Sequence, residues 1–190
     1  MTLSLAARIV ALHDGFSAGA LPHAFGGALA LSYVAEPRGT VDIDVNVFSP
    51  VHEIDAALAA LASVGLVPEQ DRQDWLPIAG IRLRGPSEPF PVDVFPSLDP
   101  AYEAIRDRVV ELPFGPEARR LPFLSAEDLT LFKLSFGRPK DWVDLTGIAA
   151  ASPDLDVEYV ERQLVTLRGP SMYPRVARLR SLLRPESPPP

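Results

Sequence analysis

The chain has 190 residues, of which 47% are hydrophobic and 23% charged, a composition typical of a folded globular protein with one sizeable core. Its 18 Lys and Arg residues are outnumbered by 25 Asp and Glu residues, and this net charge of −7 argues against non-specific DNA binding. The absence of cysteine excludes disulfides and thiolate zinc sites and favours a cytoplasmic location, and no apolar run approaches the roughly 18 residues of a membrane span.

The first part of the chain predicts a helix, a short strand and a glycine turn. Apolar residues recur at helical spacing over residues 2–16, and an apolar stretch then leads into Gly26-Gly27. The residues after this pair predict the start of a second helix. Because glycine lets the backbone approach a ligand closely, and because the first N–H groups of a helix are free, this turn suits a phosphate group.

Two acids follow on the next predicted strand, VDIDVNVF, residues 41–48. Side chains alternate along a strand, so Asp42 and Asp44 project to one side while Ile43 and Val45 project to the other. Neighbouring carboxylates repel each other unless a cation lies between them. A hard divalent cation such as Mg²⁺ prefers carboxylate oxygens and leaves room for substrate phosphates. The pattern therefore predicts a metal site next to a phosphate-binding turn.

A third acid, Asp93, lies in the middle of the apolar stretch PFPVDVF, residues 89–95. A charged group in such a run is expected to have a partner or a function. The alternation in residues 78–84 predicts a strand that pairs with this one as an antiparallel hairpin. Three acids on two strands can hold two metal ions about 3.5 to 4 Å apart for displacement at phosphorus.

The rest of the first two thirds predicts connecting elements: a helix over 51–64, a loop over 71–77, a short helix over 100–107, and an edge hairpin of strands 109–113 and 119–124. His52 and Glu53 are expected to face solvent. Trp75 in the loop fits either core packing or stacking on a nucleobase.

The last third is predicted to be helical. Ser125 is placed to cap a helix that ends near Phe136, and Gly137 and Pro139 mark the change to a second helix, on which Asp141 and Asp144 share a face. Two further helices, residues 157–167 and 173–183, are expected to form a pair packed on the end of the sheet. The arginines of the second helix fit either a solvated face or contact with an acceptor such as RNA.

Four separated blocks of this chain resemble the nucleotidyltransferase superfamily, typified by DNA polymerase beta and CCA-adding enzymes. The first two are Gly26-Gly27 with the Asp-x-Asp pair that follows, and the third is the Val-Asp-Val of residues 92–94. Within the superfamily the chain is most similar to the abortive-infection nucleotidyltransferase toxins, where Pro-Arg-x-Thr/Ser often precedes the acid pair, as in residues 37–40. Residues 125–145, SAEDLTLFKLSFGRPKDWVDL, resemble that branch's lysine motif and the basic-Asp-x-x-Asp motif after it.

The resemblance implies an α/β fold of the nucleotidyltransferase type. A mixed sheet of about five or six strands with flanking helices would form a core over residues 1–124. A C-terminal helical segment over 125–184 would pack on this core, and a disordered Pro-rich tail would follow over 185–190.

The implied activity is transfer of a nucleoside monophosphate from a nucleoside triphosphate to an acceptor hydroxyl, with two Mg²⁺ ions, or Mn²⁺, as cofactor. The resemblance assigns metal binding and catalysis to three acids: Asp42, Asp44 and Asp93. It assigns nucleotide binding to six residues: Gly26, Gly27, Arg38, Thr40, Lys133 and Asp141. Structural interpretations also remain open, since Lys133 can lay its stem on apolar surface with its amine in water and Asp141 can stabilise a helix start.

The acceptor is left open between a tRNA end, a hydroxyl of a partner protein and a small molecule. Relatives in the toxin branch often work with an antitoxin, so such a partner is also expected. Two alternatives use the same fold: a nucleotide-binding or partner-binding module without catalysis, and a hydrolase that consumes nucleotide without an acceptor.

Overall fold

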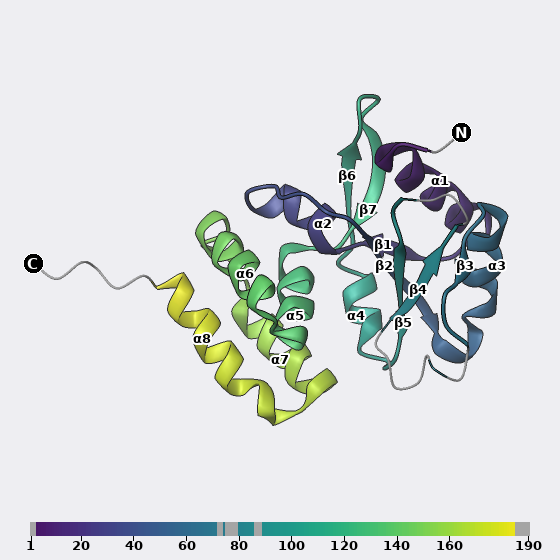
Figure 1. The fold of residues 1–190 in the computed structure, drawn as a ribbon. Coiled ribbons are helices and arrows are strands. Elements are labelled where there is room, and N and C mark those ends of the chain that lie inside the picture. The colour runs from purple at the N-terminus through teal and green to yellow at the C-terminus, as the bar shows by residue number, and fades with distance from the viewer. Residues whose placement is uncertain (1–2, 72–73, 75–79, 86–88, 185–190) are drawn as a thin grey trace, which may run out of the picture.

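A mixed sheet of seven strands runs through the described part of the protein (Figure 1). The computed structural model describes residues 3–71, 74, 80–85 and 89–184. The strands are β1 (His23–Phe25), β2 (Ile43–Pro50), β3 (Val67–Pro68), β4 (Ile81–Arg84), β5 (Val92–Ser97), β6 (Val110–Phe114) and β7 (Arg119–Phe123), in the order β3-β4-β5-β2-β1-β7-β6. The pairs β2–β5 and β1–β7 are parallel, and the other neighbours are antiparallel.

The sheet confirms the expected α/β class but has one strand more than the five or six expected. The additional strand is β3, whose two residues pair with Leu83 and Arg84 at the edge of the sheet. Two residues are too few for a period-two pattern, so only pairing with β4 defines this strand.

Eight α-helices are present in the described residues: α1 (Leu5–Ala18), α2 (Gly27–Val34), α3 (Asp55–Ser63), α4 (Tyr102–Arg106), α5 (Ala126–Phe136), α6 (Pro139–Ala151), α7 (Val157–Arg168) and α8 (Tyr173–Leu183). Figure 1 shows α1 and α3 together at one side of the sheet and α5 to α8 gathered at the other. The elements expected from the sequence are present within a few residues of their predicted ends, and His52 and Glu53 are exposed as expected.

The start of the helical third follows directly from its sequence. The Ser125 hydroxyl accepts a hydrogen bond from the Asp128 N–H at 3.2 Å, which satisfies one of the free donors at the start of α5. Gly137 ends α5 with φ of +64°, a left-handed conformation that favours glycine. Pro139 then opens α6, where its missing N–H costs nothing.

The two faces of β2 differ in the way that strand alternation predicts. Ile43, Val45 and Val47 are fully buried in the hydrophobic core, whereas Asp44 and Asn46 point to the opposite face. Asp42 lies one residue before β2 begins. The central strand therefore separates the core from a polar face.

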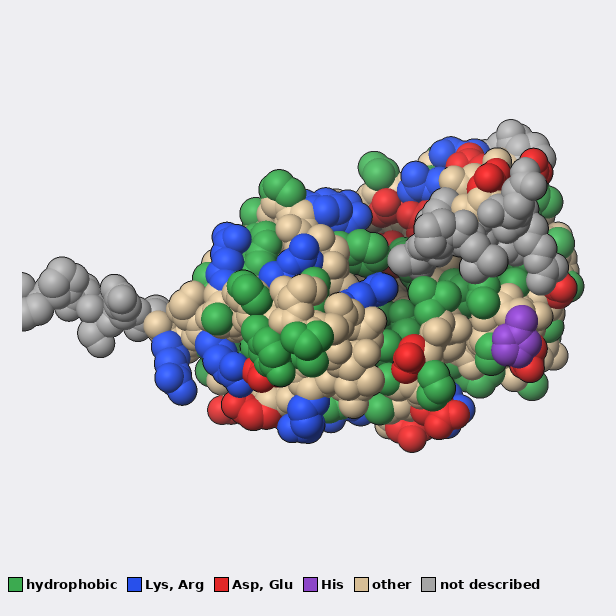
Figure 2. Space-filling model, turned by 90° about the horizontal axis from the view of Figure 1, so that it is seen from below, with side chains coloured by type: hydrophobic (Ala, Val, Ile, Leu, Met, Phe, Trp, Pro, Cys, Tyr) green, Lys and Arg blue, Asp and Glu red, His purple; other side chains and the backbone are tan. Residues whose placement is uncertain are grey.

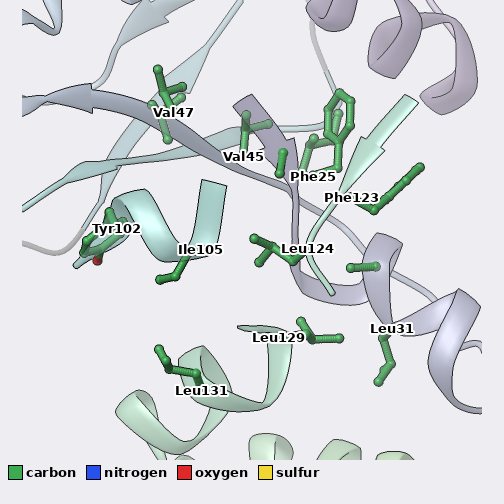
Figure 3. Packing of buried hydrophobic residues seen from close by; sticks show 14 of the residues in the cluster. Phe25, Leu31, Val45, Val47, Tyr102, Ile105, Phe123, Leu124, Leu129 and Leu131 are labelled. Atoms are coloured by element: carbon green, nitrogen blue, oxygen red, sulfur yellow. The ribbon is translucent and has the colours of Figure 1, made fainter. Parts of the chain in front are cut away.

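The hydrophobic core continues from the sheet to the C-terminal helices. Figure 3 shows Ile105 of α4 and Leu124 between the strands and the apolar side chains of α5. The rings of Tyr102 and Phe132 lie 5.9 Å apart across this contact. The sheet and α5 thus share one continuous core.

The last two helices were expected as a pair on the end of the sheet domain. Helix α7 packs on α5, helix α8 packs on α6, and α7 and α8 contact each other. Helical spacing predicts an apolar face on each helix, but not which helix covers it.

Some expectations lie outside the described residues: Trp75, the first residues of the strand predicted over 78–84, and the tail 185–190. Within the described part of the chain, no helix is long and apolar enough to cross a membrane.

Candidate active site

A cavity of about 350 Å³ opens between the polar face of β2 and β5 and the helices α5 and α6. This volume falls in the usual range for small-molecule sites. Its lining includes the three predicted acids, Gly27, Arg38, Lys133 and Asp141, together with Asn46, Arg82, Phe95, Leu124, Leu129, Phe132, Phe136, Arg138 and Lys140. The structure therefore brings most of the predicted site residues to one cavity.

The three acids converge through the register of the central strands. Parallel pairing of β2 with β5 places Asp44 directly beside Asp93, and Asp42 lies two residues before Asp44 on the same face. Burial, followed by the charges of Asp42 and Asp93, raises the pKa of Asp44 to about 6. Within the described chain, no side chain donates a hydrogen bond to the Asp44 carboxylate. Asp44 is thus left without a side-chain hydrogen-bond partner in the described chain.

The glycine turn packs directly against this acid. Gly26 donates its N–H to the Asp44 carbonyl at 2.9 Å, and Gly27 has φ of +52°. A Cβ atom on Gly27 would lie 1.7 Å from Asp44 Oδ2, far inside contact distance. Only glycine therefore fits between the start of α2 and the Asp44 carboxylate.

Asp93 has a partner that was not predicted from the sequence, namely Arg82 of β4. Arg82 faces Asp93 in the antiparallel register of β4 and β5, and its Nε and Nη2 donate to the two carboxylate oxygens at 2.9 and 3.0 Å. Arg82 Nη2 also lies 3.6 Å from Asp42 Oδ2. Burial raises the pKa of Asp93, although the guanidinium acts in the opposite direction.

Sequence information could have indicated Arg82. The predicted hairpin places residues 78–84 opposite the strand of Asp93, and an Arg on its wet face can meet an acid on the next strand. The exact register was needed to choose Arg82 over Arg84, which pairs instead with Glu69.

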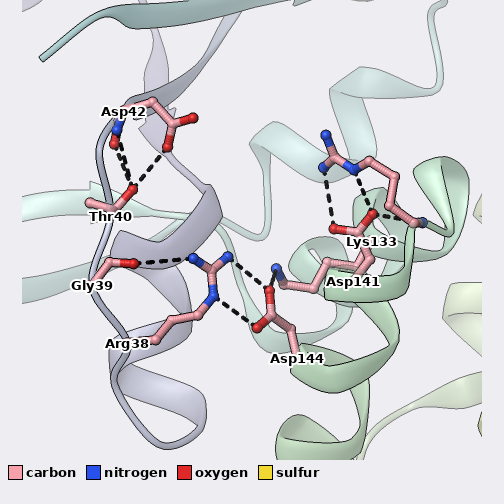
Figure 4. Close-up of polar contacts among 8 residues, drawn as sticks. Arg38, Gly39, Thr40, Asp42, Lys133, Asp141 and Asp144 are labelled. Atoms are coloured by element: carbon pink, nitrogen blue, oxygen red, sulfur yellow. Dashed lines mark hydrogen bonds and ion pairs between the residues drawn. The ribbon is translucent and has the colours of Figure 1, made fainter.

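Arg38 and Lys133 both bind one buried acid of α6, Asp144 (Figure 4). Arg38 donates to the two Asp144 oxygens at 2.9 and 3.0 Å, and Lys133 Nζ donates to Oδ2 at 2.6 Å. Burial works to raise the pKa of Asp144, but the hydrogen bonds from both cations outweigh it and hold the pKa below its ordinary value. This network ties the segment before β2 to the C-terminal helices.

The buried position of Lys133 overturns the interpretation in which its amine reaches water. The Lys133 side chain is only 6% exposed, and its amine lies inside the protein on Asp144. Its helical position gave no indication of this, because the partner is contributed by another helix. A role of Lys133 in phosphate binding stays a prediction.

Two further predicted residues support the site from its edge. The Thr40 hydroxyl lies 2.9 Å from Asp42 Oδ1 and can donate to it, so it orients that carboxylate. Asp141 accepts from the backbone N–H of Arg138 at 2.9 Å and from its guanidinium, which stabilises the start of α6. The structural interpretation of Asp141 therefore matches the geometry, while its side chain also lines the cavity.

Asn46 is a site residue that the sequence-based reasoning missed. It is 4% exposed and lines the cavity, and its Nδ2 has no hydrogen-bond partner among the described residues. It lies two residues after Asp44 and therefore on the same face of the strand, so its position could have been predicted from the sequence. A buried donor without a partner is costly unless a ligand accepts from it.

The arginines of α8 are engaged within the protein. Arg175 donates to the carbonyl of Ser135 at 2.8 Å, Arg178 stacks on Trp142 with its guanidinium 3.8 Å from the ring centre, and Arg180 binds Glu161. Figure 2 shows Lys and Arg side chains gathered over the C-terminal half of the visible face. The three arginines named here contribute to packing, so they give no support to an RNA-binding role.

The carboxylate oxygens of the site fit one hard divalent cation as ligands. Asp42 and Asp44 supply oxygen ligands. No side chain of the described chain donates a hydrogen bond to Asp44, although the charges of Lys133 and Lys140 favour its ionised form. Asp93 directs both oxygens to Arg82, and among the described residues no three His, Cys, Asp or Glu side chains are arranged to hold an ion. A second ion, as expected from the sequence, is not favoured by this arrangement.

No protein-family model matches the chain, and no curated protein matches it in sequence. The similarity found is in three dimensions, and it identifies the fold as that of the nucleotidyltransferases.

The similar solved structures are three-dimensional neighbours at low sequence identity. The antibiotic-resistance factor ANT(2'')-Ia superposes with a TM-score of 0.58 at 17% identity, covering 90% of this chain and 93% of that one. The lincosamide antibiotic adenylyltransferase LnuA, bound to lincomycin, has a TM-score of 0.53 at 16% identity and covers 74% and 94%. A nucleotidyltransferase-like protein from Paracoccidioides brasiliensis has a TM-score of 0.51 at 16% identity, covering 93% and 91%. At these identities the likeness establishes the fold.

Proposed function

We propose that this protein is a metal-dependent nucleotidyltransferase that moves a nucleoside monophosphate from a nucleoside triphosphate to an acceptor hydroxyl. The observation that carries this proposal is the unpartnered Asp44 carboxylate, packed against Gly27 at the start of a helix and facing a cavity. An acid kept nearly buried without a donor needs a cation, and a helix start beside it suits a phosphate.

Asp42 and Asp44 would hold the Mg²⁺ ion, which when bound neutralises phosphate charge and polarises the phosphoryl group. Thr40 orients Asp42, and the backbone at Gly26 and Gly27 offers close approach to phosphate oxygens. The buried Nδ2 of Asn46 supplies a donor for a bound ligand. These residues bind and orient the triphosphate, which is the main requirement of phosphoryl transfer.

In the reaction, the acceptor oxygen forms a bond to the α-phosphorus while the bond from that phosphorus to the bridging oxygen breaks, and pyrophosphate leaves. The hydroxyl proton needs a base. Because Asp42 and Asp44 would hold the ion, Asp93 is the remaining acid of the cluster that lines the cavity and would accept that proton, and burial raises its pKa above the ordinary value.

For the acceptor we propose a small molecule. The cavity of about 350 Å³ has the size of a small-molecule site, and apolar walls from Phe95, Phe132 and Phe136 border the acids. The fold neighbours include ANT(2'')-Ia in complex with adenylyl-2''-tobramycin and LnuA bound to lincomycin. A tRNA end, a protein hydroxyl, a toxin role and an antitoxin partner remain predictions from the resemblance.

The experiment that tests the proposal is thermal unfolding with each ribonucleoside triphosphate, with and without Mg²⁺. Ligand at about a hundred times its dissociation constant adds roughly 2.7 kcal/mol, or about 5 to 10 °C for a chain of this size. We expect a Mg²⁺-dependent shift in the wild type that is lost in Asp42→Asn. The exposed acid Asp154 provides a control, since Asp154→Asn removes the same charge away from the cavity.

Transfer is then measured with α-labelled nucleotide and pools of small molecules, tRNA and cell extract as acceptors. Label on a product together with released pyrophosphate supports the proposal. Nucleotide consumption without an acceptor would indicate a hydrolase, and binding without turnover would indicate a non-catalytic module. If no triphosphate shifts the midpoint in the presence of Mg²⁺, the proposed function is wrong.

A further inference from the structure

Arg82 has no role in the function proposed above, on which the following inference rests. Arg82 is half-exposed on β4, and its guanidinium lies over the acid cluster. It binds both oxygens of Asp93 and approaches Asp42 to 3.6 Å. The positively charged Arg82 side chain therefore lies between Asp42 and Asp93.

In this geometry Arg82 occupies both carboxylate oxygens of Asp93. A two-point contact between Arg and a carboxylate is planar and directional, and it is among the stronger charge-assisted hydrogen bonds. A divalent ion on Asp93 would have to approach the guanidinium closely, and like charges at such separations repel strongly in a partly buried site. An ion on Asp93 would have to displace Arg82.

The charges of the site lead to the same result. Of the three carboxylates, only Asp93 is bound by a guanidinium on both oxygens. Among the other cations that line the cavity, Arg38 and Lys133 bind Asp144 and Arg138 binds Asp141, so negative charge remains at the acid cluster for a divalent cation. Asp44, which has no donor in the described chain, is the carboxylate that most needs this ion, and Asp42 is its neighbour on the strand. Asp42 and Asp44 thus define one ion position, in which Asp44 is the carboxylate that receives no hydrogen bond from a side chain of the described chain.

We propose that Arg82 takes the place of a second metal ion, so that the protein binds one divalent cation, on Asp42 and Asp44, together with its nucleotide. Asp93 stays paired with Arg82 and is free of metal. Arg82 acts through Asp93 and is thus a positioning residue: it fixes the direction of the Asp93 carboxylate in the cavity.

The experiment is a count of bound Mn²⁺ ions by electron paramagnetic resonance and equilibrium dialysis. The protein is saturated with the α,β-methylene analogue of the triphosphate that gives the largest thermal shift, so no turnover occurs. We expect one Mn²⁺ per chain in the wild type and two in Arg82→Gln, with spin coupling between the two ions. Arg84→Gln is the matched control, because Arg84 lies on the same strand but pairs with Glu69, and it should bind one ion.

A second variant keeps the test informative if Arg82→Gln does not fold. Asp93→Asn should still bind one Mn²⁺ per chain, with affinity within about tenfold of the wild type. Two ions in the wild type, one ion in a folded Arg82→Gln, or loss of the ion in Asp93→Asn would each overturn the inference. If the wild type binds no Mn²⁺ with the analogue, the proposed function itself fails, which is a different result from two ions.

Discussion

Asp128 is fully buried and Asp44 is partly buried, and burial is the main cause that raises the pKa of each to about 6. Their surroundings differ. Asp128, between α5 and α7, accepts hydrogen bonds from the Ser125 hydroxyl at 2.6 Å and the Tyr159 hydroxyl at 2.7 Å, and Arg108 lies 3.8 Å away. Asp44 faces the cavity, and no donor from the described chain reaches its carboxylate.

The difference separates a structural acid from a functional one. The pKa of both groups is raised to about 6 although their surroundings differ, so a raised pKa alone does not identify the site. The hydrogen-bond partners identify the site. Asp128 accepts hydrogen bonds from protein side chains, whereas Asp44 needs a ligand or ion from outside the protein.

The same substitution at the two acids should have opposite consequences. Asp44→Ala should reduce nucleotidyl transfer at least about a thousandfold, equivalent to about 4 kcal/mol, because a metal ligand is lost. Its free energy of unfolding should change little, since no donor is left unpaired. The measurements are steady-state transfer rates and urea unfolding.

Asp128→Ala is the counterpart. It should keep transfer within a few fold at a temperature where it is folded, and lose about 1 to 3 kcal/mol of stability, because the hydroxyls of Ser125 and Tyr159 lose their acceptor. A large loss of stability in Asp44→Ala, or of transfer in folded Asp128→Ala, would remove the distinction.

Asp144 is a second buried acid whose hydrogen bonds come from the protein. Its loss should lower the free energy of unfolding, and by more than the loss of Asp128. Asp144→Asn leaves Arg38 and Lys133 without their shared carboxylate, and breaking a buried pair costs about 3 kcal/mol or more. Glu158→Gln, at the exposed contact with Arg180, should change stability by less than about 0.5 kcal/mol. Urea unfolding of the two variants compares them, and equal values would show that the Asp144 network contributes nothing.

A substitution at Gly27 tests how tightly the chain encloses the Asp44 carboxylate. Gly27→Ala should cost about 2 kcal/mol more stability than Gly65→Ala, because both have positive φ but only Gly27 faces an atom within contact distance. In the Asp44→Ala background this excess should shrink, which a double-mutant cycle measures. An unchanged excess would show that the clash is not with the Asp44 carboxylate.

The smallest effect is in the pH dependence of stability. Between about pH 4 and pH 6 the folded apoprotein keeps a proton on Asp44 that the unfolded chain has released, since burial raises the pKa to about 6. The stability of the wild type relative to Asp44→Asn should therefore fall as pH rises through this window and stay lower above it. Mg²⁺ should restore the difference near pH 7. Denaturant unfolding at several pH values checks both signs, and a relative gain with rising pH would contradict the assignment.

Much of the fold could be predicted because its rules are local. Six of the seven strands, the helix starts at Ser125 and Pro139 and the glycine turn follow from periodicity and turn chemistry. The strand β3 could not be predicted, since two residues carry no period. The packing of α7 and α8 on α5 and α6 was missed because amphipathic helices do not specify the surface that they cover.

In the candidate site, strand alternation alone predicts which side chains share the polar face of β2 and of the residue before it. Asp42, Asp44 and Asn46 are placed together by the two-residue period of a strand, a property of the backbone that needs no other segment. Tertiary structure decided the partners. Arg38 meets an acid 106 residues away, and Arg82 meets Asp93 through the register of two strands. Such pairs depend on how distant segments pack, so only the folded structure separates the satisfied Asp144 and Asp128 from the open Asp44.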